Sequence, residues 1–192
     1  MKRMIPAFFL AALALPAGAL ELGEDGLYEQ PWFTATFKDV AEDIADAADE
    51  GKRLAIIFEQ RGCIYCKKLH EEVFSDEEIA DYIAENFVVV RYNLYGDEEV
   101  TDVDGETLTE KEAAQRWGVV FTPTVMFMDE NVEDGESFRD VLIQTMPGAF
   151  GKGTTRDMFT WIREKGYEGD EGFQRYHARM IEARVKRGGG TD

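Results

Sequence analysis

Two cysteines, Cys63 and Cys66, are the only ones in a chain of 192 residues, and they lie three positions apart. In a helix, positions i and i+3 place their Cβ atoms about 5–6 Å apart, a separation that a disulfide tolerates. The pair can therefore open and close without a large movement of the backbone. A four-residue loop makes a poor structural staple, because closing it removes little entropy from the unfolded chain. The spacing favours a redox role over a structural one.

The residues around the pair predict how it is held. An apolar run at 54–58 precedes it, and a charged stretch with helical spacing follows at 67–72. This order predicts a strand that leads into a helix beginning at Cys63. The first amides of a helix have no internal partner, and the helix dipole is positive there, so both stabilise a thiolate. We therefore expect Cys63 to be the attacking nucleophile and Cys66, one turn further on, to be the buried resolving thiol.

The periodicity of apolar residues predicts the elements that position this pair. Buried strands are expected at 53–59 and 87–92, because both runs are short and rich in β-branched residues. A helix that ends at Gly51 is expected before the first strand. Its apolar face is predicted to hold Phe37, Val40, Ala41, Ile44 and Ala48.

Two capping boxes are predicted from a Ser or Thr followed three residues later by Glu. Ser75 and Glu78 would begin one helix, and Thr109 and Glu112 would begin another that ends at Gly118. The acidic stretch between the second strand and the later helix, 95–108, reads as a solvated loop. Its spacing does not fit a calcium-binding loop.

The second half of the chain predicts two more strands. One covers 119–128 and is interrupted at Pro123, which suits a strand start or edge. The other is expected at 141–143 and ends at a Pro-Gly pair. The first two strands, joined by a helical crossover, should be parallel, and the last two antiparallel. Two further helices are expected, with apolar faces at Met158, Phe159 and Ile162, and at Phe173, Tyr176, Met180 and Ile181.

The amino terminus, residues 1–19, reads as a signal peptide. Lys2 and Arg3 precede a short apolar core at 8–15, and Ala-Gly-Ala at 17–19 is a cleavage site. These features predict export to the periplasm and, after cleavage, no stable insertion in a membrane. An uncleaved anchor is the alternative, which the short and Pro-interrupted apolar segment disfavours.

The remainder divides into an extended lead-in at 20–36, one domain at 37–187 and a disordered tail at 188–192. The formal net charge is -18. Such acidity argues against binding to nucleic acid or to anionic membranes, and its simplest role is solubility.

Two motifs give the chain a family resemblance. The sequence F-E-Q-R-G-C-I-Y-C at 58–66 and F-T-P-T at 121–124 resemble the thioredoxin superfamily, over about residues 37–162. Within it they are similar to the periplasmic thioredoxins of bacterial sulfur-oxidation clusters, the SoxW type. The resemblance implies an α/β, thioredoxin-like fold, with a central mixed β-sheet flanked by helices and a C-terminal helical extension. It also implies a thiol-disulfide oxidoreductase.

The resemblance implies roles for residues near the cysteines. Pro123 would be cis and would pack beside the disulfide, and Thr122 would present its backbone to an extended substrate. Ile64 and Tyr65, between the cysteines, are expected to contact the same substrate. No metal or organic cofactor is expected, because the Cys63–Cys66 disulfide is itself the redox group.

Two departures from thioredoxin itself leave the proton chemistry open. Gly62 stands where thioredoxin has a tryptophan, and Ile57 stands where it has a buried aspartate. Glu59 is the nearest acid on the strand, and it is either a proton relay for Cys66 or an ordinary strand-end carboxylate. Lys67 either tunes the thiolate or is a solvated surface charge.

Three functional classes remain open. The first is a periplasmic reductase of disulfides in exported proteins, acting on sulfur-oxidation or cytochrome-maturation thiols and receiving electrons from a membrane thiol-electron transporter. The second is an oxidase or isomerase of disulfides, and the third is a binding module without catalysis. A monomer is expected. A zinc site made of Cys63, Cys66 and His70 would lack a fourth ligand.

Overall fold

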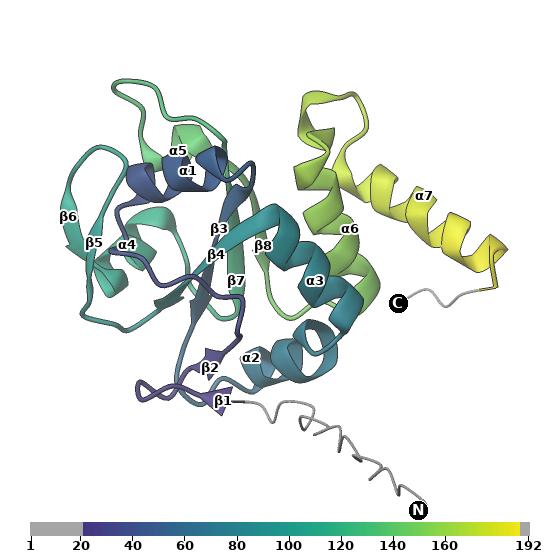
Figure 1. Ribbon diagram of the computed structural model, residues 1–192, viewed down its shortest axis with the longest axis horizontal. Helices are drawn as coiled ribbons and strands as arrows, with labels where there is room; N and C mark the ends of the chain where they lie inside the picture. The colour runs from purple at the N-terminus through teal and green to yellow at the C-terminus, as the bar shows by residue number, and fades with distance from the viewer. Residues whose placement is uncertain (1–20, 189–192) are drawn as a thin grey trace, which may run out of the picture.

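The computed structural model describes residues 21–188, and a four-stranded mixed sheet lies at its centre (Figure 1). The strand order is β4-β3-β7-β8. The strands are β3 (Arg53–Glu59), β4 (Phe87–Asn93), β7 (Thr124–Met128) and β8 (Leu142–Pro147). β3 and β4 are parallel and β7 and β8 are antiparallel, as the sequence predicted, and β7 also runs antiparallel to β3.

Helices cover both faces of the sheet. One face carries α1 (Val40–Asp49), α4 (Glu110–Trp117) and α5 (Phe138–Val141). The other carries α2 (Ile64–Leu69), a π-helical turn η1 (His70–Phe74), α3 (Glu77–Asn86), α6 (Lys152–Arg163) and α7 (Phe173–Lys186). A short 3₁₀ turn, η2 (Gly166–Glu168), joins α6 to α7, which forms the C-terminal extension at the side of the molecule (Figure 1).

The alternation of side chains along β3 explains why the molecule has two apolar cores. Leu54, Ile56 and Phe58 point into the core under α1 and α4, whereas Ala55 and Ile57 point into the core under α3 and α6. Every residue of β3 is buried, as is typical of a strand covered on both faces. This strand was predicted with the correct bounds, because its apolar run is continuous.

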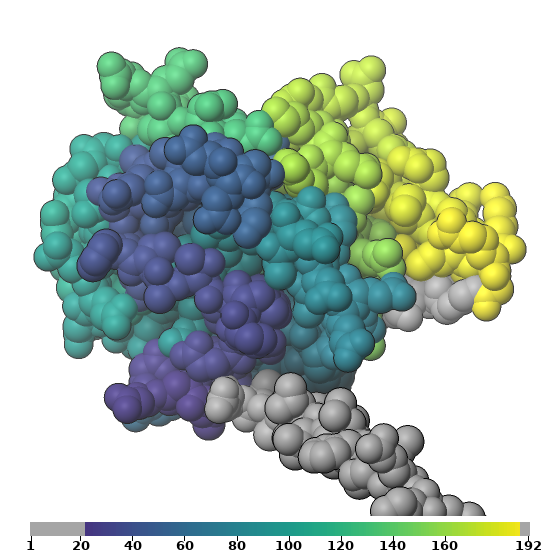
Figure 2. Space-filling view, in the orientation of Figure 1, coloured from purple at the N-terminus to yellow at the C-terminus, as the bar shows by residue number. Residues whose placement is uncertain are grey.

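The lead-in chain, coloured purple, lies at the surface of the molecule (Figure 2). It begins with a hairpin of two short strands, β1 (Glu21–Leu22) and β2 (Tyr28–Glu29). Further on, Phe33 pairs with Val89 of β4, and the Thr34 N–H donates to the Val89 carbonyl at 2.8 Å. The lead-in therefore follows the outer edge of β4.

The helix expected from Phe37 begins later. Asp39 is its N-cap and accepts a hydrogen bond from the Glu42 N–H, so α1 begins at Val40. Phe37 is 96% exposed and does not belong to the buried helix face, so this part of the prediction was wrong. The periodicity alone could not show that the Asp39 side chain begins the helix after Phe37.

The two predicted capping boxes had different outcomes. Thr109 and Glu112 form the expected box at the start of α4, which ends at Gly118 in a left-handed conformation. Ser75 does not cap α3, and the prediction was wrong by one residue, because Asp76 accepts from the Ile79 N–H. The Ser75 hydroxyl instead donates to the Glu71 carbonyl, at the end of the π-helical turn.

The acidic stretch at 95–108 is not a simple solvated loop. It contains a hairpin of β5 (Glu99–Thr101) and β6 (Thr107–Thr109). Val100 is fully buried, and the buried Asp102 accepts a hydrogen bond from Trp117 Nε1 at 3.0 Å. The acids at the tip of the hairpin concealed this alternation in the sequence.

The strand expected at 141–143 starts one residue later and runs further. Residues 138–141 form the short helix α5, and β8 then continues to Pro147, after which the chain turns at Gly148. The predicted signal peptide and almost all of the predicted tail lie outside the described residues. Within residues 21–188, no helix is both long enough and apolar enough to span a bilayer.

Candidate active site

A disulfide between Cys63 and Cys66 lies where β3 passes into α2, with a Cα–Cα distance of 5.2 Å. The chain turns at Gly62, whose φ of 72° is costly for other residues. Cys63 is the N-cap of α2, and its Sγ accepts a hydrogen bond from the Cys66 N–H at 3.0 Å. Cys63 is 7% exposed, whereas Cys66 is fully buried. The sulfur that a partner can reach first therefore belongs to Cys63.

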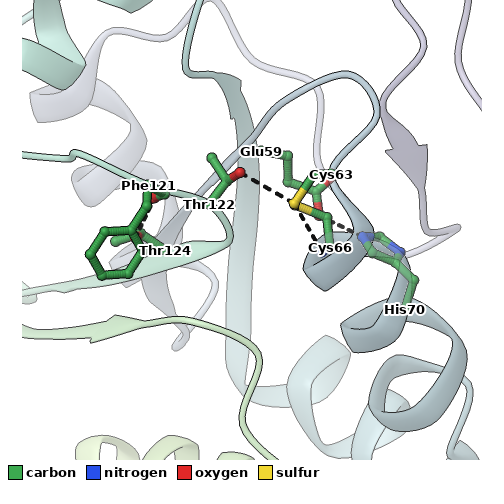
Figure 3. The surroundings of a disulfide bond; sticks show 7 residues. All are labelled: Glu59, Cys63, Cys66, His70, Phe121, Thr122 and Thr124. Atoms are coloured by element: carbon green, nitrogen blue, oxygen red, sulfur yellow. Dashed lines mark hydrogen bonds and ion pairs between the residues drawn. A yellow bond between two sulfur atoms is a disulfide. The ribbon is translucent and has the colours of Figure 1, made fainter.

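The loop before β7 completes the surroundings of the disulfide (Figure 3). The Thr122–Pro123 peptide bond is cis, the isomer that the family resemblance implies. The Thr122 hydroxyl donates a hydrogen bond to Cys63 Sγ at 3.2 Å. The Thr124 hydroxyl donates to the Phe121 carbonyl at 2.9 Å and holds the loop against the start of β7. This loop and the start of α2 together frame Cys63.

Exposed apolar side chains lie on the two segments that frame the sulfur. On α2, Ile64 and Tyr65 are 72% and 59% exposed, and in the loop before β7, Val120 and Phe121 are 77% and 49% exposed. A cavity of about 240 Å³ opens beside this loop and is lined by Trp117, Val119, Val120, Phe121, Met126 and Pro147, among others. Exposed apolar groups on the segments next to a reactive atom favour a contact surface for another chain.

A buried acid–histidine pair lies next to the resolving cysteine. Glu59 and His70 are both fully buried, and His70 Nε2 lies 2.6 Å from Glu59 Oε1. Glu59 is therefore not an ordinary solvated carboxylate at a strand end. His70 follows Cys66 by four residues, and its backbone N–H donates to the Cys66 carbonyl. The contact between Glu59 and His70 was missed from the sequence, although the i, i+4 spacing of His70 from Cys66 was a signal that placed it on the same helix face.

The second ring nitrogen of His70 is also engaged. Gln30 Nε2, in the lead-in, lies 2.9 Å from His70 Nδ1. Both ring nitrogens that a metal could use are therefore in hydrogen bonds. In the described part of the chain, no group of three or more His, Cys, Asp or Glu side chains is arranged to hold a metal ion.

The cations near the cysteines are directed away from them. Lys67 is half-exposed and pairs with Glu71 at 3.4 Å, and Lys68 pairs with Glu72 at 3.8 Å. Arg61 donates from its guanidinium to the Asp25 carbonyl at 2.9 Å. Lys67 therefore lies on the outer side of α2 and not beside the disulfide.

Burial raises the pKa of three groups on the opposite face of the sheet. Burial raises the pKa of Asp43, on α1, from 3.8 to about 6, although a hydrogen bond from Thr36 opposes this shift. Burial also raises the pKa of Glu110, and Lys38 partly offsets it. The pKa of Tyr92 is raised well above its ordinary value by burial. These groups pack around α1 and α4, away from α2.

Comparisons with known proteins agree with this geometry. The sequence profile of the thioredoxin-like domain family matches residues 40–140, which include both cysteines and Pro123. A thioredoxin-fold protein from Helicobacter pylori superposes with a TM-score of 0.58 at 19% identity, over 81% of this chain and 90% of that chain. A thioredoxin from Thermus thermophilus gives a TM-score of 0.51 at 21% identity, over 67% of this chain and 86% of that chain. No curated relative matches the sequence.

Proposed function

The chain belongs to the family of thioredoxin-like domains and is a thiol-disulfide oxidoreductase, and from that premise we propose that it works as a reductase of disulfides in exported proteins. Its redox group is the Cys63–Cys66 pair, without a metal or organic cofactor. Cys63 attacks the substrate disulfide, and Cys66 resolves the mixed disulfide. An oxidoreductase of this fold can run in either direction, so the direction needs its own argument.

The observation that carries the direction is the placement of the cations. Strong oxidants of this fold stabilise the reduced form by stabilising the nucleophilic thiolate. Here Arg61 binds a backbone carbonyl, and Lys67 pairs with a glutamate on the outer side of α2. The Cys63 thiolate is therefore stabilised by the Cys66 N–H and the Thr122 hydroxyl but by no adjacent cation within the described residues. This arrangement supports a reducing pair.

The surface around Cys63 supports a protein substrate. Ile64 and Tyr65 follow Cys63 on α2, and Thr122 and Pro123 belong to the loop whose Thr122 hydroxyl meets Cys63 Sγ, so an extended segment bound beside the sulfur would contact all four. A segment that adds along the loop would gain main-chain hydrogen bonds, as in other strand-addition complexes. We propose that these four residues contact the substrate.

Export and partners follow from the sequence motifs. Residues 1–19 have the features of a cleaved signal peptide, so we propose that the mature protein starts at Leu20 in the periplasm. Its substrates would be disulfide-bearing periplasmic proteins, and its electron donor a membrane thiol-electron transporter. The likeness of the motifs at 58–66 and 121–124 to SoxW-type thioredoxins favours sulfur-oxidation or cytochrome-maturation thiols as the targets. We propose a monomer.

The direction is tested by the reduction potential of the Cys63–Cys66 pair, measured by equilibration with a reference dithiol. We expect a value near that of thioredoxin, roughly −270 mV, and far from that of a strong oxidant, roughly −120 mV. A value at the oxidising end would replace the reductase by an oxidase. Failure of the dithiol form to reduce insulin would leave only a binding module.

Export is tested separately by the intact mass of the native protein purified from its own cells. A mass that corresponds to a chain starting at Leu20 is expected. A full-length product retained in the membrane fraction would instead support an uncleaved anchor.

A further inference from the structure

We propose that His70 is a positioning residue that holds Glu59 so that its second carboxylate oxygen, Oε2, takes the proton of the Cys66 thiol. Gln30 of the lead-in keeps the His70 ring in the tautomer that this requires, with the ring proton on Nε2. The inference rests on the dithiol chemistry of the proposed function. It does not rest on the direction of electron flow, because the same proton returns by the same route in the reverse reaction.

The backbone places Cys66, His70 and Glu59 together. Cys66 and His70 are one helical turn apart, and the His70 N–H donates to the Cys66 carbonyl. Residues at this spacing lie on the same face of a helix. A π-helical turn begins at His70, and such turns are frequent at functional sites. Glu59 ends β3, and Figure 3 shows its side chain pointing toward the disulfide while its carboxylate meets His70.

The two oxygens of Glu59 have different surroundings. Oε1 lies 2.6 Å from His70 Nε2, whereas Oε2 is buried and has no hydrogen-bond partner. A buried polar atom without a partner is costly, so it calls for a role. The dithiol state can supply the missing donor, because a cysteine S–H is a weak donor and a disulfide sulfur is none. Oε2 is therefore the oxygen available to the Cys66 thiol.

Gln30 determines which ring nitrogen of His70 carries the proton. The Gln30 amide N–H donates to His70 Nδ1 at 2.9 Å, so Nδ1 must be unprotonated. The single ring proton is then on Nε2 and is donated to Glu59 Oε1. Glu59 Oε1 is then occupied by the His70 N–H, and Oε2 is the oxygen left to accept a proton.

The surroundings of His70 keep other acids and bases away. The rings of Tyr28, Phe33 and Phe74 pack against the imidazole, with centroids 5.2, 5.7 and 5.3 Å away. From the lead-in, Tyr28 is the titratable group that faces the ring. On β4, the residue opposite Glu59 is Asn93, which does not titrate. The neighbouring charges at Lys67 and Glu71 pair with each other on the outer side of the helix.

In the reducing direction, the Cys63 thiolate attacks the substrate disulfide, and one substrate sulfur leaves as a thiolate. The Cys66 S–H then gives its proton to Glu59 Oε2, and the Cys66 thiolate attacks Cys63 Sγ. The bond between Cys63 and the substrate breaks, and its electron pair leaves on the second substrate sulfur. The substrate gains two electrons, the dithiol loses two, and Glu59 passes its proton to the departing thiolate or to water.

A chromogenic aromatic disulfide, dithiobis(nitrobenzoate), separates the attack by Cys63 from the attack by Cys66 in a stopped-flow experiment. The first molecule of coloured thiolate appears when Cys63 attacks, and the second appears when Cys66 resolves the mixed disulfide. At neutral pH we expect His70→Asn to slow the second phase by about 10–100-fold, within the usual contribution of general acid–base catalysis, and the first phase by less than about twofold. The defect should shrink at alkaline pH, where hydroxide removes the thiol proton directly.

Two matched variants separate positioning from folding. His70→Gln keeps an N–H donor toward Glu59 and should restore the second phase to within about threefold of the parent protein. His177→Asn removes the other histidine that pairs with a buried carboxylate, far from the disulfide, and should change neither phase. Equal slowing of both phases by His70→Asn, or an unchanged second phase at neutral pH, would overturn the proposal.

Gln30→Glu provides an independent test should His70→Asn fail to fold. A carboxylate at position 30 would accept a proton from His70 Nδ1 and hold the ring as a cation. A cation beside Glu59 makes its carboxylate a weaker base, so the second phase should slow by about 3–10-fold. An unchanged or faster second phase would contradict the assignment of Gln30 and His70. Failure of the reductase function would instead appear in the reduction potential of the parent protein, which this experiment does not use.

Discussion

Two histidines of this protein each lie 2.6 Å from a buried carboxylate, yet the two pairs are built for different tasks. Glu59 has one oxygen bound by His70 and one oxygen without a partner. Asp157, on α6, binds His177 of α7 and also accepts two hydrogen bonds from Arg184, at 2.7 and 3.0 Å. Glu59 therefore has one oxygen without a partner, whereas both oxygens of Asp157 have partners.

The surroundings of the two pairs follow the same division. His177 is partly exposed and its other ring nitrogen meets the Thr154 hydroxyl at 3.2 Å, so the Asp157 pair joins two helices at the surface. The Glu59 pair is fully enclosed and lies one helical turn from a redox-active sulfur. The comparison teaches that the distance within an acid–histidine pair does not reveal its role. The two pairs are instead distinguished by whether the second carboxylate oxygen has a hydrogen-bond partner.

The largest effect is expected when either of the two cysteines beside the Glu59–His70 pair is replaced. Cys63→Ser should abolish the reduction of insulin, because the remaining cysteine, Cys66, is fully buried and cannot reach a substrate disulfide. Cys66→Ser should retain the attack by Cys63 and accumulate mixed disulfides with substrates, since the resolving thiol is missing. Non-reducing gels and mass spectrometry of captured partners measure both outcomes. Equal capture by the two variants would reverse or remove the assigned roles.

The comparison is sharpened by neutralising each carboxylate in turn. Asp157→Asn should lower the free energy of unfolding by about 2–4 kcal/mol, because it leaves the Arg184 guanidinium facing a group that can no longer balance its charge. Glu59→Gln should change it by less than about 1 kcal/mol, because it also removes a buried negative charge that has few partners. Urea unfolding monitored by circular dichroism measures both values.

Activity should respond in the opposite order. Glu59→Gln should slow the resolving step as much as His70→Asn does, and the double variant should be no slower than either single variant, because the two residues act as a unit. Asp157→Asn should leave that step unchanged under conditions where the protein is folded. A destabilised Glu59→Gln protein with normal kinetics would show that both pairs are structural.

Asp43 is a third buried carboxylate, and it differs from Glu59 and Asp157 because no basic side chain contributes to its pKa shift. Burial, with smaller contributions from the nearby acids Asp39, Asp46 and Glu42, raises its pKa to about 6 against the hydrogen bond from Thr36. An unfolded aspartate titrates near about 3.9. Ionisation is therefore more costly in the folded state, and stability should fall as the pH rises from about 4 to about 6 and then level off.

Asp43→Asn should remove this contribution. We expect a gain of about 1–2 kcal/mol in the free energy of unfolding at neutral pH, after allowing for solvent screening. No gain is expected near about pH 4, which is close to the pKa of an aspartate in the unfolded chain. Unfolding curves at several pH values for the parent and the variant measure the difference. A variant that is less stable at neutral pH would show that the Asp43 charge is stabilised by its surroundings.

The parts of this site that the sequence predicted depend on neighbours along the chain. The C-x-x-C pair, the strand before it and the capping box at Thr109 were all predicted, because each is specified by residues within a few positions. The Glu59–His70 contact joins residues eleven positions apart through a turn and a helix, and it is completed by Gln30 from forty positions away. Local periodicity carries no information about such a contact.

The failed predictions have a related cause. Phe37 fits the apolar period of the helix that follows, yet the Asp39 cap starts that helix after it and leaves the ring in solvent. The hairpin at 99–109 has only three residues in each strand, and the acids around it suggest a solvated loop. In both places a single side-chain hydrogen bond or a buried partner overrides the pattern, as Trp117 does by burying Asp102.

The pairing of the lead-in with β4 also affects how the molecule meets copies of itself. An open strand edge is a template for aggregation, and β4 and β8 are the two edge strands of the described sheet. The Thr34 N–H fills a place on the edge of β4, and β8 ends at Pro147, which has no N–H to offer. A chain shortened beyond Thr34 would therefore expose the bare edge of β4 and precipitate through edge-to-edge strand pairing, in addition to losing Gln30 beside His70.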